Sequence, residues 1–552
     1  MISIVGEYGS RTYYYGTRSS QAILGMSKER RTDNPHSPSR IIFGSCSSQH
    51  FEQPFWDVIQ QRDPTAFVWA GDAVYADDRR DENGSILDGT PDYLRMLYQQ
   101  QQHIPGYQAL VRSGVSIFGT IDDHDYGTNN GDNTFPWKRE NGMEFVSFLG
   151  LKEATSAMAR RVSRGKGVYG VQVYDFGMDP KQTRLLSDTE AGLDPDVVST
   201  KEWKKRKENV PERRQVVAVF VLDVRTNKTP WTKQIPERYS KYPDGDYLGE
   251  EQWTWFEEAI GRSDAAVNII VSGVQVHAPW FYDGNLVENW SVFPKAQHRL
   301  YQAILQPNVR APLLVTGDIH LTQLLRKDCN KLQQSSSHST ALESGTRVLY
   351  EITTSGMTHS WGSTDTSVCG RPNMSRLCRF YPYNALFSAI MTFAHWTSPW
   401  TALLKDTRTN MPQYSLARNI AEVEMDWEQN TIIVRLVGTE GQILLRQQWN
   451  MDDLSGSLGE TDSMMLLSAK SFEIARKRLE LDINATVSDD EFICVNYRGN
   501  PDPIQLAFSV LSIVTFAMLS SIYPLFVCVG LIIACSRRRP WSNSVRTKRK
   551  EN

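Results

Sequence analysis

The sequence predicts a layered α/β domain followed by a membrane-spanning helix, and three observations support this prediction. Short apolar runs that end in Gly, Asp or both recur between residues 41 and 318, as buried strands do. Stretches with helical periodicity lie between these runs, and alternating strands and helices are typical of α/β folds. Near the C-terminus, one apolar stretch without a charged residue is long enough to cross a bilayer.

The predicted strands and helices follow a polar lead-in. Residues 1–39 are rich in Ser, Arg, Tyr and Gly and are expected to be poorly ordered. Strands are predicted at 41–44, 66–72, 115–122, 216–223, 267–273 and 311–318. Helices are predicted at 54–59, 91–98, 250–260 and 297–305. A hairpin of 420–427 and 431–437, with a third strand at 442–449, completes a domain expected to span residues 40–450.

The composition is that of a globular protein. The chain has 552 residues, of which 40% are hydrophobic and 22% charged, enough for one large domain or two to three ordinary ones. The formal net charge of -3 provides no basic field that would attract nucleic acid, whereas a small anionic substrate needs only a local site. Residues 179–214 are charged and polar and predict a surface insertion, and residues 330–345 predict a flexible loop.

The C-terminal region predicts an anchor in a lipid bilayer. Residues 504–535 contain no charged residue and are predicted to form a transmembrane helix. The preceding segment, 451–503, is expected to be helical and acidic, and the basic tail 536–552 follows the helix. By the positive-inside tendency, the C-terminus is then cytoplasmic and the large domain is lumenal or extracellular. Because residues 1–30 show no signal-peptide pattern, a tail-anchored protein with a cytosolic domain is the alternative.

Sequons and cysteines give further expectations about the compartment. The N-x-S/T sequons all precede the predicted span and favour a lumenal glycoprotein; they are at Asn83, Asn227, Asn289, Asn373 and Asn484. Seven cysteines are too sparse for a disulfide scaffold in a chain of this length, although Cys369 and Cys378 are close enough to pair across a loop.

Polar side chains with metal-binding chemistry follow the predicted strands. In layered α/β folds, functional groups collect just past the carboxyl ends of strands. The residues in such places are Cys46, Asp72, Tyr75, the cluster 122–125 (Asp-Asp-His-Asp), Asn129, Asp318 and His320. Carboxylate, imidazole, amide, phenolate and thiolate groups are together the donor set of a site for hard or borderline metals.

The spacing of these residues suits two cations. Gly71 allows close backbone approach, and the two oxygens of Asp72 can bridge two metals. A thiolate and a phenolate, from Cys46 and Tyr75, suit ferric iron or another charged transition metal better than magnesium. Asp318 and His320 lie two residues apart and point to the same side of an extended chain. Two cations about 3.5–4 Å apart would clamp phosphate oxygens and activate a water.

Each residue also has a structural interpretation when taken alone. Asp72 could cap a helix, Tyr75 could be a packed aromatic, and Cys46 could be a small buried hydrophobe. His320 could equally be a hydrogen-bonded structural histidine. The adjacent carboxylates of the 122–125 cluster are harder to explain this way, because they repel each other unless a cation or hydrogen-bond donors are present.

The ordered motifs resemble the alkaline phosphatase D (PhoD-like) branch of the metallophosphoesterases. The matching segments are 43–48 (FGSCSS), 69–77 (WAGDAVYAD), 122–129 (DDHDYGTN), 222–225 (LDVR), 248–253 (LGEEQW), 272–275 (SGVQ), 289–294 (NWSVFP), 316–320 (TGDIH) and 354–359 (TSGMTH). The resemblance implies a four-layer αββα sandwich, a metal centre of iron (Fe3+) with calcium or other divalent metals, and hydrolysis of phosphomonoesters or phosphodiesters.

The resemblance also implies roles for individual residues. Cys46, Asp72 and Tyr75 would hold the iron-like ion, and Asp72 would bridge to the second metal. Asn129, Asp318 and His320 would be further ligands. The candidate catalytic residues are His124, Asp123 and Arg225. His124 would protonate the leaving oxygen or contact the transition state, whereas Arg225 would pair with phosphate oxygens or form a surface ion pair.

The predicted function is therefore a membrane-anchored, metal-dependent phosphoesterase acting on a phosphate ester. Two alternatives differ in class. One is a membrane-anchored binding module that keeps the fold without turnover, and the other is an iron-thiolate redox enzyme. One bound metal would indicate redox chemistry and two would indicate hydrolysis. The sequence leaves open the physiological substrate, the metal identities and the oligomeric state.

Overall fold

The computed structural model describes most of the chain between residues 39 and 522. The described residues are 39–177, 184–207, 215–231, 241–278, 288–331, 346–363, 388–393, 411–455, 469–497, 504, 507–519 and 522. They form a mixed α/β fold with two sheets, which confirms the predicted class. The predicted lead-in, the loop 330–345, the Cys369–Cys378 pair and the tail 536–552 lie mostly or wholly outside the described residues.

The first sheet has six strands. Their order is β14 (Ile443–Asn450), β13 (Thr431–Val437), β12 (Ile420–Asp426), β1 (Ser39–Gly44), β2 (Ala66–Ala70) and β3 (Ser116–Thr120). Strands β1, β2 and β3 are parallel, whereas β12 pairs antiparallel with β1. The three parallel strands therefore end at the same edge of the sheet, where the predicted ligands follow them.

The second sheet has nine strands. Its order is β11 (Tyr414–Ser415), β9 (Thr322–Lys331), β10 (Arg347–Thr354), β8 (Pro312–Thr316), β7 (Val267–Ser272), β6 (Val216–Leu222), β4 (Gly170–Asp175) and β5 (Arg184–Leu186), and β15 (Phe492–Asn496) pairs with β9. Strands β6, β7 and β8 are parallel neighbours, and β10 is parallel to β8. All six apolar runs predicted as strands are strands.

Helices occupy the connections between strands. They are α1 (Phe55–Gln61), α2 (Pro91–His103), α3 (Pro105–Arg112), α4 (Asp123–Tyr126), α5 (Lys138–Phe148), α6 (Ala157–Ser163), α7 (Asp188–Ala191), α8 (Thr200–Lys207), α9 (Gly249–Gly261), the 3-10 helix η3 (Trp290–Val292), α10 (Pro294–Ile304), α13 (Met451–Leu454) and α14 (Ala469–Ile483). The region predicted as a surface insertion contains β5, α7 and α8. Two further helices span residues 388–393 and 507–519.

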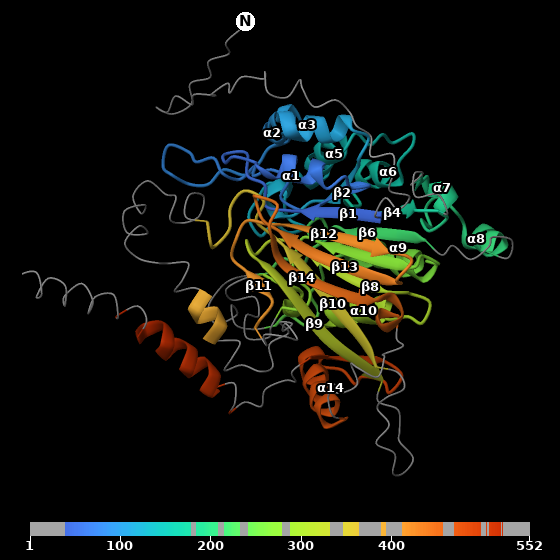
Figure 1. Cartoon of the computed structure of the whole chain (residues 1–552), viewed down its shortest axis with the longest axis vertical. Coiled ribbons are helices and arrows are strands. Elements are labelled where there is room, and N and C mark those ends of the chain that lie inside the picture. The colour runs from blue at the N-terminus through green and yellow to red at the C-terminus, as the bar shows by residue number, and fades with distance from the viewer. Residues whose placement is uncertain are drawn as a thin grey trace, which may run out of the picture. The chain divides into compact units, whose positions relative to one another are not determined.

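Alternate residues of β6 pack into two different cores. Val217, Val219 and Val221 belong to a core shared with the first sheet and its helices, and Ala218 and Phe220 belong to a core shared with α9 and α10. A run of buried β-branched residues forms such a strand because both of its faces are covered. Figure 1 shows α2, α3 and α5 grouped beside β1 and β2. This packing holds the carboxyl ends of the parallel strands in fixed positions.

The segment after residue 450 contributes a strand to the second sheet. Strand β15 pairs antiparallel with β9, and Cys494 lies opposite Cys329, to which it is disulfide-bonded. This bond was not among the predictions, because the pairing of cysteines cannot be deduced from their spacing. Of the predicted span 504–535, the structure describes residues 504, 507–519 and 522. No helix in the described part of the chain is both long and apolar enough to cross a membrane.

Candidate metal centre

Three glycines let strand ends approach closely, within the first sheet at Gly71 and between the two sheets at Gly273 and Gly317. At Gly71, whose φ is +92°, an added Cβ would lie 2.5 Å from Cβ of Asp122. At Gly273 it would lie 2.7 Å from Cγ of Asp122, and at Gly317 it would lie 2.7 Å from the carbonyl oxygen of Ala70. No side chain fits in these contacts, so glycine at the strand ends is a requirement of the geometry.

Four of the predicted ligands have a left-handed backbone. The φ angles are 57° at Cys46, 52° at Asp72, 71° at Asp318 and 54° at His320. L-residues rarely adopt this conformation, and where they do, at a cost of order 1–3 kcal/mol each, the site is often functional. The turns after β1, β2 and β8 therefore aim these side chains at one region.

The Cys46 thiol is fully buried beside polar partners. Its Sγ atom lies 3.0 Å from Oγ of Ser355 and 3.6 Å from Oδ2 of Asp72. Burial raises the pKa of the Cys46 thiol to about 11. A thiolate at this position therefore needs a cation next to it, and this matches its predicted role as a ligand.

Tyr75 meets two histidines at its hydroxyl group. The Oη atom lies 3.2 Å from Nε2 of His320 and 3.2 Å from Nε2 of His359. Burial, together with the charge of His124, lowers the pKa of His320 to about 4, and burial also lowers the pKa of His359. Both shifts favour the neutral imidazole, the form in which histidine binds metals. His359 was not predicted, although it ends the 354–359 motif.

Three carboxylates gather on the other side of Asp72. One oxygen each of Asp122, Asp123 and Asp318 lies within 4.8 Å of the others. Burial raises the pKa of Asp318 well above its ordinary value, and the charges of Asp122 and Asp123 raise it further. Oδ2 of Asp122 and Oδ1 of Asp123 are buried without a hydrogen-bond partner among the described residues. Unpaired buried carboxylate oxygens fit a hard cation, which would supply the missing positive charge.

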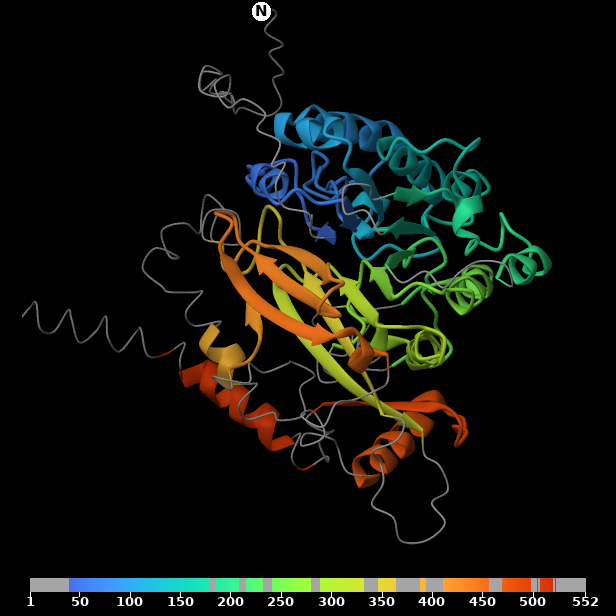
Figure 2. The same cartoon turned by 45° about the vertical axis from the view of Figure 1, so that its right-hand side comes forward.

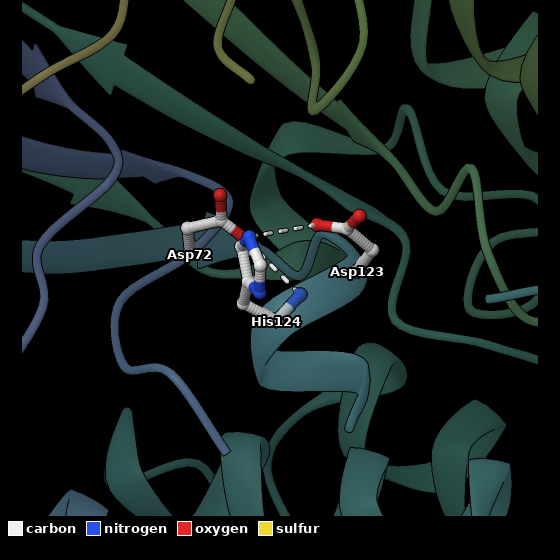
Figure 3. A group of neighbouring side chains, drawn as sticks. All are labelled: Asp72, Asp123 and His124. Atoms are coloured by element: carbon white, nitrogen blue, oxygen red, sulfur yellow. Dashed lines mark hydrogen bonds and ion pairs between the residues drawn. The ribbon is translucent and has the colours of Figure 1, made fainter. Parts of the chain in front are cut away.

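His124 links this carboxylate group to Asp72. One oxygen each of Asp72 and Asp123 and a ring nitrogen of His124 also lie within 4.8 Å of one another (Figure 3). The His124 backbone N–H donates to Oδ1 of Asp72 at 3.2 Å, and Nδ1 lies 2.7 Å from Oδ1 of Asp77. The ring stacks on Tyr75 with centroids 4.0 Å apart. Although burial lowers the pKa of His124, the carboxylates of Asp123, Asp72 and Asp77 together raise it well above its ordinary value.

Arg225 is a buried ion-pair partner, so the expectation of a surface ion pair is wrong. Its Nε–H donates to Oδ1 of Asp122 at 2.5 Å, and Nη1 donates to Oε2 of Glu288 at 2.8 Å. Lys228 pairs with Glu288 as well, at 2.6 Å. Charges that are buried require such partners. Nη2 of Arg225 has no hydrogen-bond partner among the described residues, and its contact with phosphate stays a prediction.

The remaining residues of the acidic motif have structural contacts. Oδ1 of Asp125 accepts from the backbone N–H of Asp122 at 2.6 Å, and Oδ2 accepts from that of Ala73 at 3.0 Å, which fixes the start of α4. Asn129 has an exposed side chain in the turn after α4, and its ligand role stays a prediction. The backbone N–H of the next residue, Asn130, donates to Oδ2 of Asp123 at 2.7 Å.

Two supporting residues were not singled out from the sequence. Asp77 ends the 69–77 motif and orients His124. Ser355 lies in the 354–359 motif, and its Oγ accepts from the backbone N–H of His320 at 2.6 Å while it contacts Cys46. Each of these residues belongs to a motif identified in the sequence. Only the fold shows which site residue each of them contacts.

Comparison with known proteins gives one family match. Residues 215–376 match the family model described as PhoD-like phosphatase, in agreement with the resemblance seen in the motifs. A solved structure described as "Structure of PhoD" aligns with a TM-score of 0.44 and 13% sequence identity, covering 76% of this chain and 71% of that chain. No protein with a curated description matches the chain.

Proposed function

We propose that this chain, which matches the PhoD-like phosphatase model over residues 215–376, is a metal-dependent hydrolase of phosphate monoesters or diesters. The observation that carries the proposal is the pair of ligand groups that share Asp123. One group is Asp72, Asp123 and His124, and the other is Asp122, Asp123 and Asp318. Carboxylates this close together could hold two cations about 3.5–4 Å apart, the spacing of two-metal phosphoesterases, with His124 beside them as the acid.

The donor chemistry divides the centre into two sides. Cys46, Asp72, Tyr75 and His320 would hold an iron-like ion, and His359 adds a further nitrogen beside the Tyr75 hydroxyl. The carboxylates of Asp122, Asp123 and Asp318 provide only oxygen donors, which suit calcium or another hard divalent cation. Asp72 lies between the two sides, which supports its role as a bridging ligand. Bound cations would polarise the phosphate oxygens and activate a water for in-line attack.

His124 is the proposed proton donor to the leaving oxygen. Asp77 holds its Nδ1 atom, so Nε2 is directed toward Asp123, 3.9 Å away. Three carboxylates favour the protonated imidazole, which is the form that a general acid needs. Arg225 holds Asp122 in place through its Nε–H and would offer Nη2 to a phosphate oxygen. A four-layer αββα arrangement around this centre is part of the proposal.

The disulfide supports a lumenal or extracellular placement of the domain. Disulfides persist in oxidising compartments and are rare in the cytosol, and Cys329 and Cys494 are bonded in this chain. We therefore favour the predicted single-pass topology, with a cytoplasmic C-terminus, over a tail-anchored protein with a cytosolic domain. The family match is to phosphatases, which does not favour a binding module without turnover.

Hydrolysis assays on the purified full-length chain would test the proposal. The substrates are p-nitrophenyl phosphate and bis-p-nitrophenyl phosphate, with iron and calcium added or removed by a chelator. The variants are Asp72→Asn and, as a control, Asp88→Asn, whose side chain is exposed in the loop before α2. Chelator-sensitive turnover that only Asp72→Asn abolishes would support the proposal, and the rate ratio would distinguish monoesterase from diesterase. A folded protein with two bound metals and no turnover would refute it.

A further inference from the structure

A second uncharged segment of the chain lies in contact with the apolar C-terminal helix. Residues 380–404 contain no Asp, Glu, Lys or Arg, and seven of these 25 residues are Phe, Tyr or Trp. Arg379 precedes this stretch and Lys405 follows it. Aromatic residues bounded by cations are typical of segments at the interface of a membrane with water.

The two segments meet through stacked aromatic rings. The structure describes helix 388–393 from the uncharged stretch and helix 507–519 from the predicted span. The rings of Phe393 and Phe516 are stacked, with centroids 4.4 Å apart and planes inclined by 9°. Figures 1 and 2 both show the two helices close together. We call helices 388–393 and 507–519 the apolar pair.

The apolar pair exposes large hydrophobic side chains. On helix 507–519, Phe508 is 67% exposed, Leu511 63%, Met518 61% and Leu519 63%. Ala389 on the shorter helix is exposed as well. Several large apolar side chains exposed on one helix indicate an interaction site rather than a surface in water.

The apolar pair is connected to the loops of the metal centre. The Tyr414 hydroxyl donates to the carbonyl of Ser388 at 2.9 Å and lies 2.8 Å from Oγ1 of Thr392. Tyr414 belongs to β11, which pairs with Thr322 and Gln323 at the start of β9. Leu416, Ile319 and Leu321 form an apolar cluster with Tyr414 and Trp361 packed against it.

That cluster contains the neighbours of two metal-centre histidines. Ile319 and Leu321 flank His320 in the chain, and Trp361 follows His359 by two residues. The Trp361 backbone N–H donates to the carbonyl of His320 at 3.0 Å. The apolar pair is therefore linked, through Tyr414 and this cluster, to the loops that carry His320 and His359.

We propose that the apolar pair docks the catalytic domain on a lipid bilayer, so that the metal centre is held at the membrane surface. The occupant is a bilayer because the uncharged stretch that contains helix 507–519 extends from Ile504 to Cys535, which exceeds the about 20 apolar residues that cross a bilayer. The basic residues that follow, beginning with Arg537, complement an anionic leaflet. This docking does not depend on the proposed hydrolysis.

Photo-crosslinking in vesicles would test the docking. The full-length chain is reconstituted in vesicles of phosphatidylcholine and phosphatidylserine, with benzoylphenylalanine placed at Ala389, Phe508 or Met96. Met96 is the control because it is 43% exposed on α2, a helix that lies away from the apolar pair in both views. We expect lipid adducts at Ala389 in a yield comparable with that at Phe508, and only background at Met96.

Two results would overturn the proposal. Adducts at Phe508 with none at Ala389 would mean that the C-terminal helix inserts while the domain stays off the membrane. Protein–protein adducts at Ala389 would mean that a second copy of the chain covers this surface. A membrane-confined carbene reagent on the unmodified chain gives an independent measurement. Label in the peptides of helix 388–393 would support docking, and label in helix 507–519 alone would refute it.

Discussion

The Nδ1 atom of His124 lies 2.7 Å from Oδ1 of Asp77, and this contact directs the other ring nitrogen toward the carboxylates of the centre. Asp77 and His124 come from the segments that follow β2 and β3, two parallel neighbours in one sheet. Two motifs that are separate in the sequence therefore meet at one edge of the sheet, where Asp77 orients the His124 ring.

Asp77→Asn should lower kcat by about 10–100-fold with little change in KM, because residues that orient a catalytic or ligating histidine have effects of this size. Steady-state kinetics and metal content of the full-length protein would be measured together. Asp78→Asn is the matched control, since the neighbouring Asp78 contacts exposed His50 and Tyr93 instead. Equal losses in both variants, or loss of metal in Asp77→Asn, would contradict the orienting role.

Asp72→Asn should stabilise the metal-free protein and weaken its response to metal. Burial raises the pKa of Asp72 well above its ordinary value, and the nearby Cys46 and Asp123 raise it further, so a neutral amide relieves an unfavourable charge. In the wild type, metal at about 100 times its Kd would add about 2.7 kcal/mol to the free energy of unfolding. Thermal unfolding with and without metal, with Asp88→Asn as control, measures both effects. An unchanged response to metal would remove Asp72 from the ligand set.

Arg225→Met should lower the free energy of unfolding by about 3–5 kcal/mol, because it leaves the buried carboxylate of Asp122 without its cation. Denaturant unfolding would be compared with that of Arg95→Met, whose ion pair with Glu144 is half exposed and should matter little. A large loss of activity at unchanged stability would instead show that Arg225 acts mainly on the phosphate.

The strands that position the centre could be predicted because their sequences allow few alternatives. Val216–Leu222 is a continuous run of apolar residues and is buried along its whole length. Strand β9 was missed, because Arg326 and Asp328 give its sequence a polar character. In the fold these two residues pair with each other at 2.8 Å while buried. A buried strand therefore escapes prediction from sequence when its charged residues form ion pairs with each other inside the fold.

The candidate site was predictable where the ligand directly follows a strand. Cys46, Asp72 and Asp318 come within two residues of β1, β2 and β8, so strand prediction alone places them at the sheet edges. The partnership of Arg225 with Asp122 spans 103 positions in the chain and depends on the packing of two sheets. Sequence spacing carries no information about such a contact, which is why the sequence predicted for Arg225 a phosphate contact or a surface ion pair, and not a buried pair with Asp122.

Loss of the Cys329–Cys494 bond should destabilise the protein by about 2–5 kcal/mol, because the bond closes a long loop in the unfolded chain. Non-reducing peptide mapping should first recover the two linked peptides. Thermal unfolding of a Cys329→Ala/Cys494→Ala variant would then be compared with that of Cys378→Ser, which leaves this bond intact. Free thiols at both positions in the native protein would contradict the pairing, and with it the support for an oxidising compartment.

Gly273→Ala should reduce turnover by at least about tenfold, since displacements of about 1 Å in a catalytic geometry cost up to about 100-fold. The new Cβ would lie 2.7 Å from Cγ and Oδ1 of Asp122, so this carboxylate must leave its present position beside Asp123 and Asp318. At Gly261 the nearest atom to an added Cβ is Oε1 of Gln306 at 3.5 Å, an ordinary contact, which makes Gly261→Ala the matched control. Kinetics and metal content of both variants would be measured beside their thermal stability. Normal turnover in Gly273→Ala would mean that the position of Asp122 is not required for the reaction, whereas a defect confined to Gly273→Ala places Asp122 in the working centre.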